Sequence, residues 1–353
     1  IGFQACDDST AAIGTYTDGK CEANATSYAT TPSVLGVVGP FNSGCAMAAL
    51  PALNAAGDQP VPVVSPTNSY IGLTRVIPGI SAPADLHRLY LTGVRNYVRT
   101  YPADDAQADA DAALAVQLGA KRVAVIVLDP KDSYATSLAH GFTRAVKARD
   151  LELVRVASAS RNGVGTTAAQ LRSRRVDAIL LAGLAGFSGG NGRAEQLLRT
   201  LDSDGGRRMI VIAPDGWLPA SMVAEQLGTA AQGMYISGAY VTDPEHQLPS
   251  AGVDFIREFS ATQPDRVVNQ FTPYAAAATE VLLRAIAASD GTRLSVIDQL
   301  FKVRIENGVI GSFGFTKTGD MTPASIPVFR VDTSRPPGAP DRVFQVIEVT
   351  PPN

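Results

Sequence analysis

A chain of 353 residues is long enough for about two domains of roughly 150 residues each. Its composition, with 45% hydrophobic and 18% charged residues, is typical of a folded globular protein and excludes a disordered one. Lys and Arg number 30 against 33 Asp and Glu, so a net charge of −3 leaves no basic excess for binding nucleic-acid phosphates. Apolar runs such as Val123–Leu128 are as long as a strand, and none approaches the roughly 20 residues of a membrane-spanning helix.

The three histidines give no indication of a metal site. His87, His140 and His246 are far apart in the chain, no two are spaced i, i+4, and none has a cysteine beside it. We therefore expect neither a metal ion nor a cofactor.

The three cysteines, Cys6, Cys21 and Cys45, all lie near the N-terminus. This clustering favours one local disulfide, one remaining thiol and an oxidising compartment. Three pairings are possible, of which we favour Cys21–Cys45, and three buried reduced thiols are the alternative.

Strand-like apolar runs alternate with helix-like amphipathic runs over the first 240 residues. The expected strands are Val34–Val38, Val61–Ser65, Arg122–Leu128, Glu152–Ala157, Asp177–Ala182, Met209–Ala213 and Met234–Ala239. The expected helices are Ala46–Ala56, Asp104–Leu118, Tyr134–Ala148, Thr166–Arg174, Asn191–Leu201 and Ser221–Leu227. This order predicts an α/β fold with parallel sheets covered by helices on both faces.

The rhythm changes after Tyr240, where helices come first and strands follow. The expected helices are Val253–Thr262, Pro273–Ser289 and Leu294–Phe301, and the expected strands are Pro327–Val331 and Val343–Val349.

A series of sequence blocks along nearly the whole chain resembles one protein family. The run Val34–Thr74 contains a strand, a Gly-Pro turn with small hydroxyl residues, a helix and a second strand that ends in Ser65-Pro66-Thr67. Further blocks in the same order are Arg99–Gln107, Lys121–Asp129, Val176–Ala182, Ala213–Gly216, Ala231–Met234, Tyr274–Ala277 and Gly311–Asp320. The order and spacing of these blocks resemble the type I periplasmic binding proteins, specifically the branched-chain amino acid receptors of ABC transporters.

The resemblance implies two Rossmann-like lobes with parallel sheets, joined by three crossing strands. Lobe one would hold residues 1–102 and 243–321, and lobe two residues 103–242 and 322–353. The crossings would fall near Tyr101-Pro102, Val241–Pro244 and Thr318–Ala324, which are turn-like in composition. The family begins with a strand and a helix before the strand that corresponds to Gly2–Ala5, so we expect upstream residues in the natural protein, where a signal peptide could lie.

The resemblance also implies a function. The chain would be a non-enzymatic, extracytoplasmic solute-binding protein that captures a small amino acid or related carboxylate between two closing lobes. It would then deliver this ligand to a membrane ABC permease.

Five residues of lobe one are candidates for ligand binding. Ser43 and Gly44 lie where a strand leads into a helix, and free N–H groups at a helix start suit a carboxylate. A simple N-cap by Asn42 or Ser43 is the alternative. Family positions that hold an amino acid's polar head match Thr67 and Ser69, and Phe271 could form an apolar wall.

Three residues of lobe two complete the candidate site. Tyr134 matches a family tyrosine that reaches the ligand, and Asp215 matches the acidic residue that receives the ligand ammonium. Trp217, the one tryptophan, could form a second apolar wall, with plain packing as the alternative. Leu184 and Ala185 stand where the family has an aromatic residue, so the resemblance leaves the ligand's side chain open.

Two other functions fit parts of the sequence. The same fold serves as the extracellular ligand-sensing domain of membrane signalling proteins. A serine hydrolase is the remote alternative, because Gly186-Phe187-Ser188-Gly189-Gly190 matches G-x-S-x-G and an acid and His246 follow it. A nucleophile elbow, however, needs its serine directly between strand and helix, and five residues separate Ala182 from Ser188.

Overall fold

The computed structural model describes residues 1–12, 16–57, 59–78, 80–156, 163–188, 192–203, 209–263, 268–336 and 339–350. The chain forms two compact units, each assembled from separated stretches. Unit 1 contains Ile1–Ala103 and Leu248–Ala324, and unit 2 contains Asp104–Gln247 and Ser325–Thr350.

Unit 1 is built on a parallel sheet of three short strands in the order β1-β2-β3. Val37 of β1 pairs with Val63 of β2, which pairs with Tyr97 of β3. A separate antiparallel sheet has the order β11-β10-β9. The strands are β1 (Val37–Val38), β2 (Val63–Ser65), β3 (Tyr97–Arg99), β9 (Ile305–Gly308), β10 (Gly311–Phe315) and β11 (Met321–Thr322). The helices are α1 (Asp18–Thr30), α2 (Ser43–Asn54), α3 (Pro83–Leu89), α11 (Ser250–Thr262), α12 (Thr272–Ala287) and α13 (Arg293–Leu300), with a 3-10 turn η1 (Ile71–Leu73).

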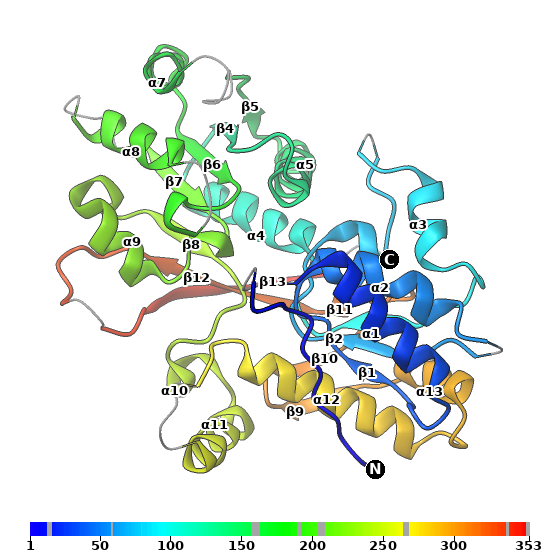
Figure 1. Ribbon diagram of the computed structural model, residues 1–353. Coiled ribbons are helices and arrows are strands. Elements are labelled where there is room, and N and C mark those ends of the chain that lie inside the picture. The colour runs from blue at the N-terminus through cyan, green and yellow to red at the C-terminus, as the bar shows by residue number, and fades with distance from the viewer. Residues whose placement is uncertain are drawn as a thin grey trace. The chain divides into compact units, whose positions relative to one another are not determined.

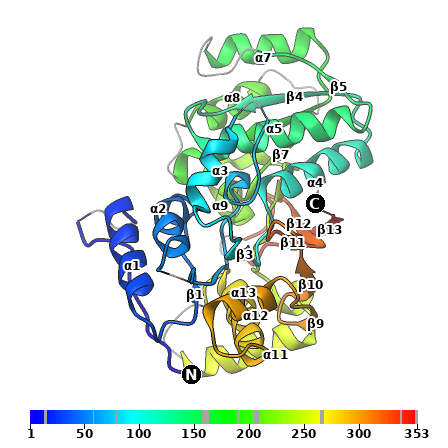
Figure 2. The same cartoon turned by 90° about the vertical axis from the view of Figure 1, so that its right-hand side faces the viewer.

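Alternating side chains of β2 serve two different cores. Val63 packs in a cluster with α2 that includes Leu50 and Leu53, whereas Val64 packs with α12, against Ala278 and Val281. Successive residues of a strand point to opposite faces, so this unbroken apolar strand needs a helix layer on each side. Figure 2 shows the two layers, with α1 and α2 on one side of β1 and α12 and α13 on the other.

Strands β1 and β2 are parallel neighbours, so their carboxyl ends lie side by side. The loops that follow these strands therefore meet at one edge of the sheet, which is where open α/β sheets bind ligands.

Unit 2 contains a sheet of seven strands in the order β13-β12-β8-β7-β6-β4-β5. The run from β8 to β5 is parallel, and β12 joins β8 antiparallel. The strands are β4 (Arg122–Val127), β5 (Glu152–Leu153), β6 (Ala178–Ala182), β7 (Ile210–Ala213), β8 (Tyr235–Ser237), β12 (Ala324–Arg330) and β13 (Val343–Val349). The helices are α4 (Asp104–Gln117), α5 (Ser133–Lys147), α7 (Val164–Ser173), α8 (Arg193–Ser203), α9 (Ala220–Leu227) and α10 (Pro244–Gln247), with 3-10 turns η2 (Gly186–Ser188), η3 (Asp215–Trp217) and η4 (Gly228–Ala231).

Helices cover both faces of the parallel part of this sheet. Every residue of the central strand β6, Ala178–Ala182, is buried, as a strand with two covered faces requires. Figure 1 shows α4 and α5 on one side of these strands and α7, α8 and α9 on the other. The core on the first side joins Leu138 and Phe142 of α5 to Leu180 of β6.

A disulfide joins α1 to α2 in unit 1. Cys21 and Cys45 are bonded with their Cα atoms 5.5 Å apart, and Cys6 is free and exposed. The favoured pairing is therefore present.

The expected strand at Gly2–Ala5 is wrong. Residues 1–8 form no strand, and the side chains of Ile1 and Phe3 are exposed. Within the described residues no strand lies beside this segment, so its N–H and C=O groups have no ladder to join.

No helix in the described part of the chain combines the length and the apolar character that crossing a membrane demands.

Candidate functional site

In unit 1, the loops after β1 and β2 are tied together by hydrogen bonds. The Ser65 hydroxyl at the end of β2 donates to Pro40 O at 3.1 Å. Asn68 Nδ2 donates to Phe41 O at 2.8 Å, and the Thr67 hydroxyl donates to the same oxygen at 2.6 Å. The two loops therefore form one polar surface at the carboxyl edge of the sheet.

Helix α2 begins at this edge with Ser43. Its N-cap residue, Asn42, makes no side-chain hydrogen bond to the first turn. The Ser43 Oγ instead accepts the N–H of Tyr70 at 3.3 Å, which orients the hydroxyl from the β2 loop. A first turn without a side-chain cap leaves N–H groups and the positive end of the helix dipole for an anion.

The neighbouring candidate, Gly44, is packed beneath a tyrosine. A Cβ at position 44 would clash with the Tyr16 hydroxyl, so a larger residue there would force the Tyr16 side chain to move. This contact favours a glycine, and a backbone N–H role for Gly44 stays a prediction.

The hydroxyl proton of Thr67 is already used within the loop. Because Thr67 donates to Phe41 O, its oxygen is left to act toward a ligand as an acceptor, as an ammonium group requires. Ser69 is partly buried and lies between Asn68 and Tyr70, both of which are held by hydrogen bonds.

Aromatic side chains lie beside this polar surface. The rings of Phe41 and Phe271 meet edge to face at 5.4 Å, and Tyr101 contacts Phe271 at 6.0 Å and Tyr274 at 5.3 Å. Phe41 lies two residues before Ser43, and its side chain is 49% exposed. The sequence identified Phe271 but missed Phe41, whose place directly after the Gly-Pro turn was the available signal.

In unit 2, Tyr134 and Asp215 come together at the carboxyl ends of β4 and β7. Tyr134 lies in the first turn of α5, where the side chain of its N-cap Asp132 accepts the N–H of Tyr134 at 3.0 Å. The Tyr134 hydroxyl donates to Asp215 Oδ1 and accepts the N–H of Gly216 at 3.1 Å. The tyrosine therefore fixes both the carboxylate and the turn that carries it.

Burial and negative charge dominate the electrostatics of this part of unit 2. Burial, together with the charge of Asp215, raises the pKa of Tyr134 well above its usual value. Burial also raises the pKa of Asp111 to about 8, with the charge of Asp215 adding to the effect and the Ser237 hydroxyl opposing it. No sequence motif marks Asp111, which lies within the acidic, Ala-rich helix α4.

Trp217 lies in the interior of unit 2. It is 0% exposed, its indole N–H donates to Gly183 O at 3.0 Å, and its ring meets Phe187 edge to face at 6.1 Å. These contacts favour the packing alternative, and a wall role for Trp217 stays a prediction.

The residues of the hydrolase alternative are placed only in part. His246 is exposed and pairs with Asp243 three residues earlier, at 2.9 Å between Nδ1 and Oδ2. Gly189 and Gly190 lie outside the described residues, as does the side chain of Ser188.

Over the described ranges, one group of potential metal ligands is close enough to share an ion, namely Asp8, Cys21 and Cys45. Both sulfur atoms of this group are consumed by the disulfide, so it does not offer thiolate ligands.

A family model described as periplasmic binding protein matches residues 18–336 of the chain. No curated protein gives a significant match.

Several solved structures resemble most of the chain. A leucine binding protein from Thermotoga maritima is 21% identical, with a TM-score of 0.67 over 94% of this chain and 85% of that one. An ABC transporter substrate-binding protein from Desulfitobacterium hafniense, solved in complex with Leu, is 19% identical, with a TM-score of 0.69 over 93% and 85%. A solute binding protein of an ABC transporter from Rhodopseudomonas palustris, in complex with p-hydroxybenzoic acid, is 16% identical, with a TM-score of 0.67 over 95% and 84%. These matches confirm the expected fold class.

Proposed function

The chain belongs to the periplasmic binding protein family, and from this premise we propose that it captures a small amino acid or related carboxylate for an ABC transporter. The observation that carries the proposal is the start of α2, which has no side-chain cap and presents Ser43 at the edge of a parallel sheet. Such a helix start offers N–H donors and a positive dipole end to a carboxylate.

Unit 2 supplies a group of opposite character. The Asp215 carboxylate, oriented by Tyr134, suits the ammonium group of an amino acid. An amino acid carries both charges, so the start of α2 would suit its carboxylate and Asp215 its ammonium.

The ligand class is supported by the relatives. Leucine and p-hydroxybenzoic acid, bound by two of the similar structures, differ in their side chains and in the ammonium group but share a carboxylate. The proposed common element is therefore the carboxylate at α2. Asp215 would distinguish amino acids from plain acids.

The family also suggests where the protein works and with what partner. We propose that it acts outside the cytoplasm and delivers its ligand to a membrane permease. Neither step needs catalysis by this chain, which would bind and release an unchanged solute.

A thermal-shift screen tests the proposal. Amino acids, keto acids and aromatic acids are compared at equal concentration. A ligand at 100 times its Kd should stabilise the protein by about 2.7 kcal/mol. A shift for one or more carboxylates and none for the matched amides supports the function, whereas a screen with no shift at all contradicts it.

A further inference from the structure

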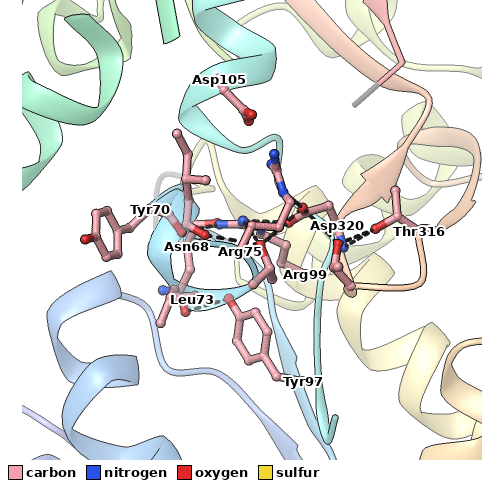
Figure 3. Close-up of polar contacts among 12 residues, drawn as sticks. Asn68, Tyr70, Leu73, Arg75, Tyr97, Arg99, Asp105, Thr316 and Asp320 are labelled. Atoms are coloured by element: carbon pink, nitrogen blue, oxygen red, sulfur yellow. Dashed lines mark hydrogen bonds and ion pairs between the residues drawn. The ribbon is translucent and has the colours of Figure 1, made fainter. Parts of the chain in front are cut away.

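A buried arginine and a buried aspartate meet behind the polar surface of unit 1. Arg99, the last residue of β3, is 0% exposed, and the side chain of Asp320 is 1% exposed. Arg99 Nε lies 2.8 Å from Asp320 Oδ1, and Nη2 lies 2.6 Å from the same oxygen. Figure 3 shows this pair between the loop at Asn68 and Tyr70 and the loop at Thr316.

The other donors of the guanidinium are directed at the loop after β2. Arg99 Nη1 donates to Tyr70 O at 2.8 Å and to Asn68 O at 3.2 Å. These two carbonyl groups belong to the residues on either side of Ser69. The N–H of Tyr70 in turn donates to Ser43 Oγ, so the backbone of this one tyrosine links Arg99 to the start of α2.

Asp320 holds the guanidinium in this orientation. Its carboxylate also accepts Arg75 Nε at 2.8 Å and the Thr74 hydroxyl at 2.9 Å, and its backbone N–H donates to Thr316 Oγ1 at 3.1 Å. Burial alone would raise the pKa of Asp320, but the charges of Arg99 and Arg75 outweigh burial and lower it. The aspartate is therefore ionised.

Stability alone does not account for such a pair. Replacing a buried ion pair with well-packed apolar residues is often neutral or stabilising, because both charges lose their hydration. What apolar residues cannot supply is a rigid fork of donors that reaches two backbone carbonyls at once.

We propose that Arg99 is a positioning residue for ligand capture. Its guanidinium, oriented by Asp320, fixes the backbone on both sides of Ser69 and, through the Tyr70 amide, the hydroxyl of Ser43. The inference rests on the proposed function in placing Ser43 and Ser69 at the ligand.

Unit 1 contains a matched control in Arg293, a second buried arginine that serves backbone carbonyls. It is 8% exposed, and it donates to Val34 O at 2.8 Å and to Thr31 O at 2.7 Å, beyond the C-terminal end of α1. Arg293→Met removes a buried guanidinium from its carbonyls just as Arg99→Met does, but away from the loop at Ser69.

The experiment compares Arg99→Met with Arg293→Met in two readouts. The first is hydrogen exchange over the loop from Ser65 to Tyr70 in the ligand-free protein. The second is the affinity for two probes, L-leucine and 4-hydroxybenzoate. In Arg99→Met only, we expect hydrogen exchange over this loop to be at least about tenfold faster than in wild type. We also expect Arg99→Met to bind the probe that wild type binds at least about tenfold more weakly, because misplaced binding groups lose affinity steeply.

Equal loop exchange in the two variants would overturn the inference. So would equal affinity, because the loss of any buried guanidinium in unit 1 would then account for the effect of both variants. A wild-type protein that binds no amino, keto or aromatic acid would count against the proposed function, while the exchange comparison still decides whether Arg99 fixes the loop.

Arg99→Lys keeps the test decisive if Arg99→Met does not fold. Lysine retains the positive charge beside Asp320, but its single ammonium lacks the fork that reaches both carbonyls. We expect a folded protein with faster loop exchange than wild type. Full wild-type protection and affinity in Arg99→Lys would show that only the charge matters and would overturn the inference.

Discussion

The Tyr134 hydroxyl donates a hydrogen bond to the carboxylate of Asp215, although the two residues are 81 positions apart and belong to different elements of unit 2. The same oxygen accepts the N–H of Gly216, so one side chain holds both the acid and its turn. This contact gives the proposed ammonium partner a fixed orientation.

Removing the Asp215 carboxylate should weaken the binding of amino acids. Loss of one partner of a buried charge pair typically costs about 2–5 kcal/mol, so Asp215→Ala should lower affinity by roughly 30-fold to several thousand-fold. Calorimetric titration of both proteins with an amino acid that wild type binds measures this change in affinity.

The matched keto acid is the control for this variant. It keeps the carboxylate but lacks the ammonium, so its affinity should fall much less. An amino-acid affinity that stays within about threefold of wild type would rule out the ammonium role, since that change is well under 1 kcal/mol.

Tyr134→Phe should act on the same carboxylate indirectly. The variant removes a hydrogen bond to a charged group, which is worth about 1.5–3 kcal/mol, while keeping the ring. We expect the variant to be less stable than wild type in urea unfolding. We also expect its affinity for amino acids to fall more than its affinity for keto acids. Unchanged stability together with unchanged selectivity would show that the hydroxyl positions nothing.

Asp111 should make the stability of unit 2 depend on pH. Its pKa in the folded protein is raised from 3.8 to about 8, mainly by burial. Between these two pKa values, the folded state keeps a proton that the unfolded state has lost. Stability from this group is therefore complete below the unfolded pKa, falls by about 1.4 kcal/mol per pH unit as pH rises, and levels off above the folded pKa.

Asp111→Asn should remove this component, because an amide does not titrate. Urea unfolding from pH 4 to pH 9 should show a shallower decline for the variant than for wild type. Parallel curves would mean that Asp111 is ionised in the folded protein.

The disulfide should leave a single reactive thiol. Alkylation of the unreduced protein followed by mass spectrometry should label Cys6 only, and reduction should lower stability by about 3 kcal/mol for a loop of this length. Cys6→Ser is the control, with no labelled thiol and unchanged stability. Three labelled thiols in the unreduced wild type would show that the bridge does not form.

Much of unit 2 could be predicted from the sequence, because long apolar runs and amphipathic helices carry their own periodicity. The helix expected at Asp104–Leu118 is α4 (Asp104–Gln117), and the strand expected at Arg122–Leu128 is β4 (Arg122–Val127). The sequence did not predict strand β3, because it has only three residues and ends in the charged residue Arg99. Arg99 can be buried only because it pairs with Asp320, which is a tertiary contact.

The site was predictable one residue at a time but not as pairs. Ser43, Thr67 and Asp215 each follow a strand, which is a local feature of the sequence. The residues that orient them come from distant parts of the chain. Arg99, for example, is held by Asp320, which lies 221 positions later. No periodicity reports such a pairing, because it depends on how the helices and strands pack. The lobe borders and the ligand roles of the eight candidate residues stay predictions.

Calorimetric titration of the wild-type protein with its best carboxylate ligand and with the matching carboxamide shows whether the ligand is bound by its carboxylate. We expect one site per chain for the acid and at least about tenfold weaker binding of the amide, since the amide loses the charge that the helix start attracts. Equal affinity for acid and amide, or no binding of any amino, keto or aromatic acid, would contradict this expectation.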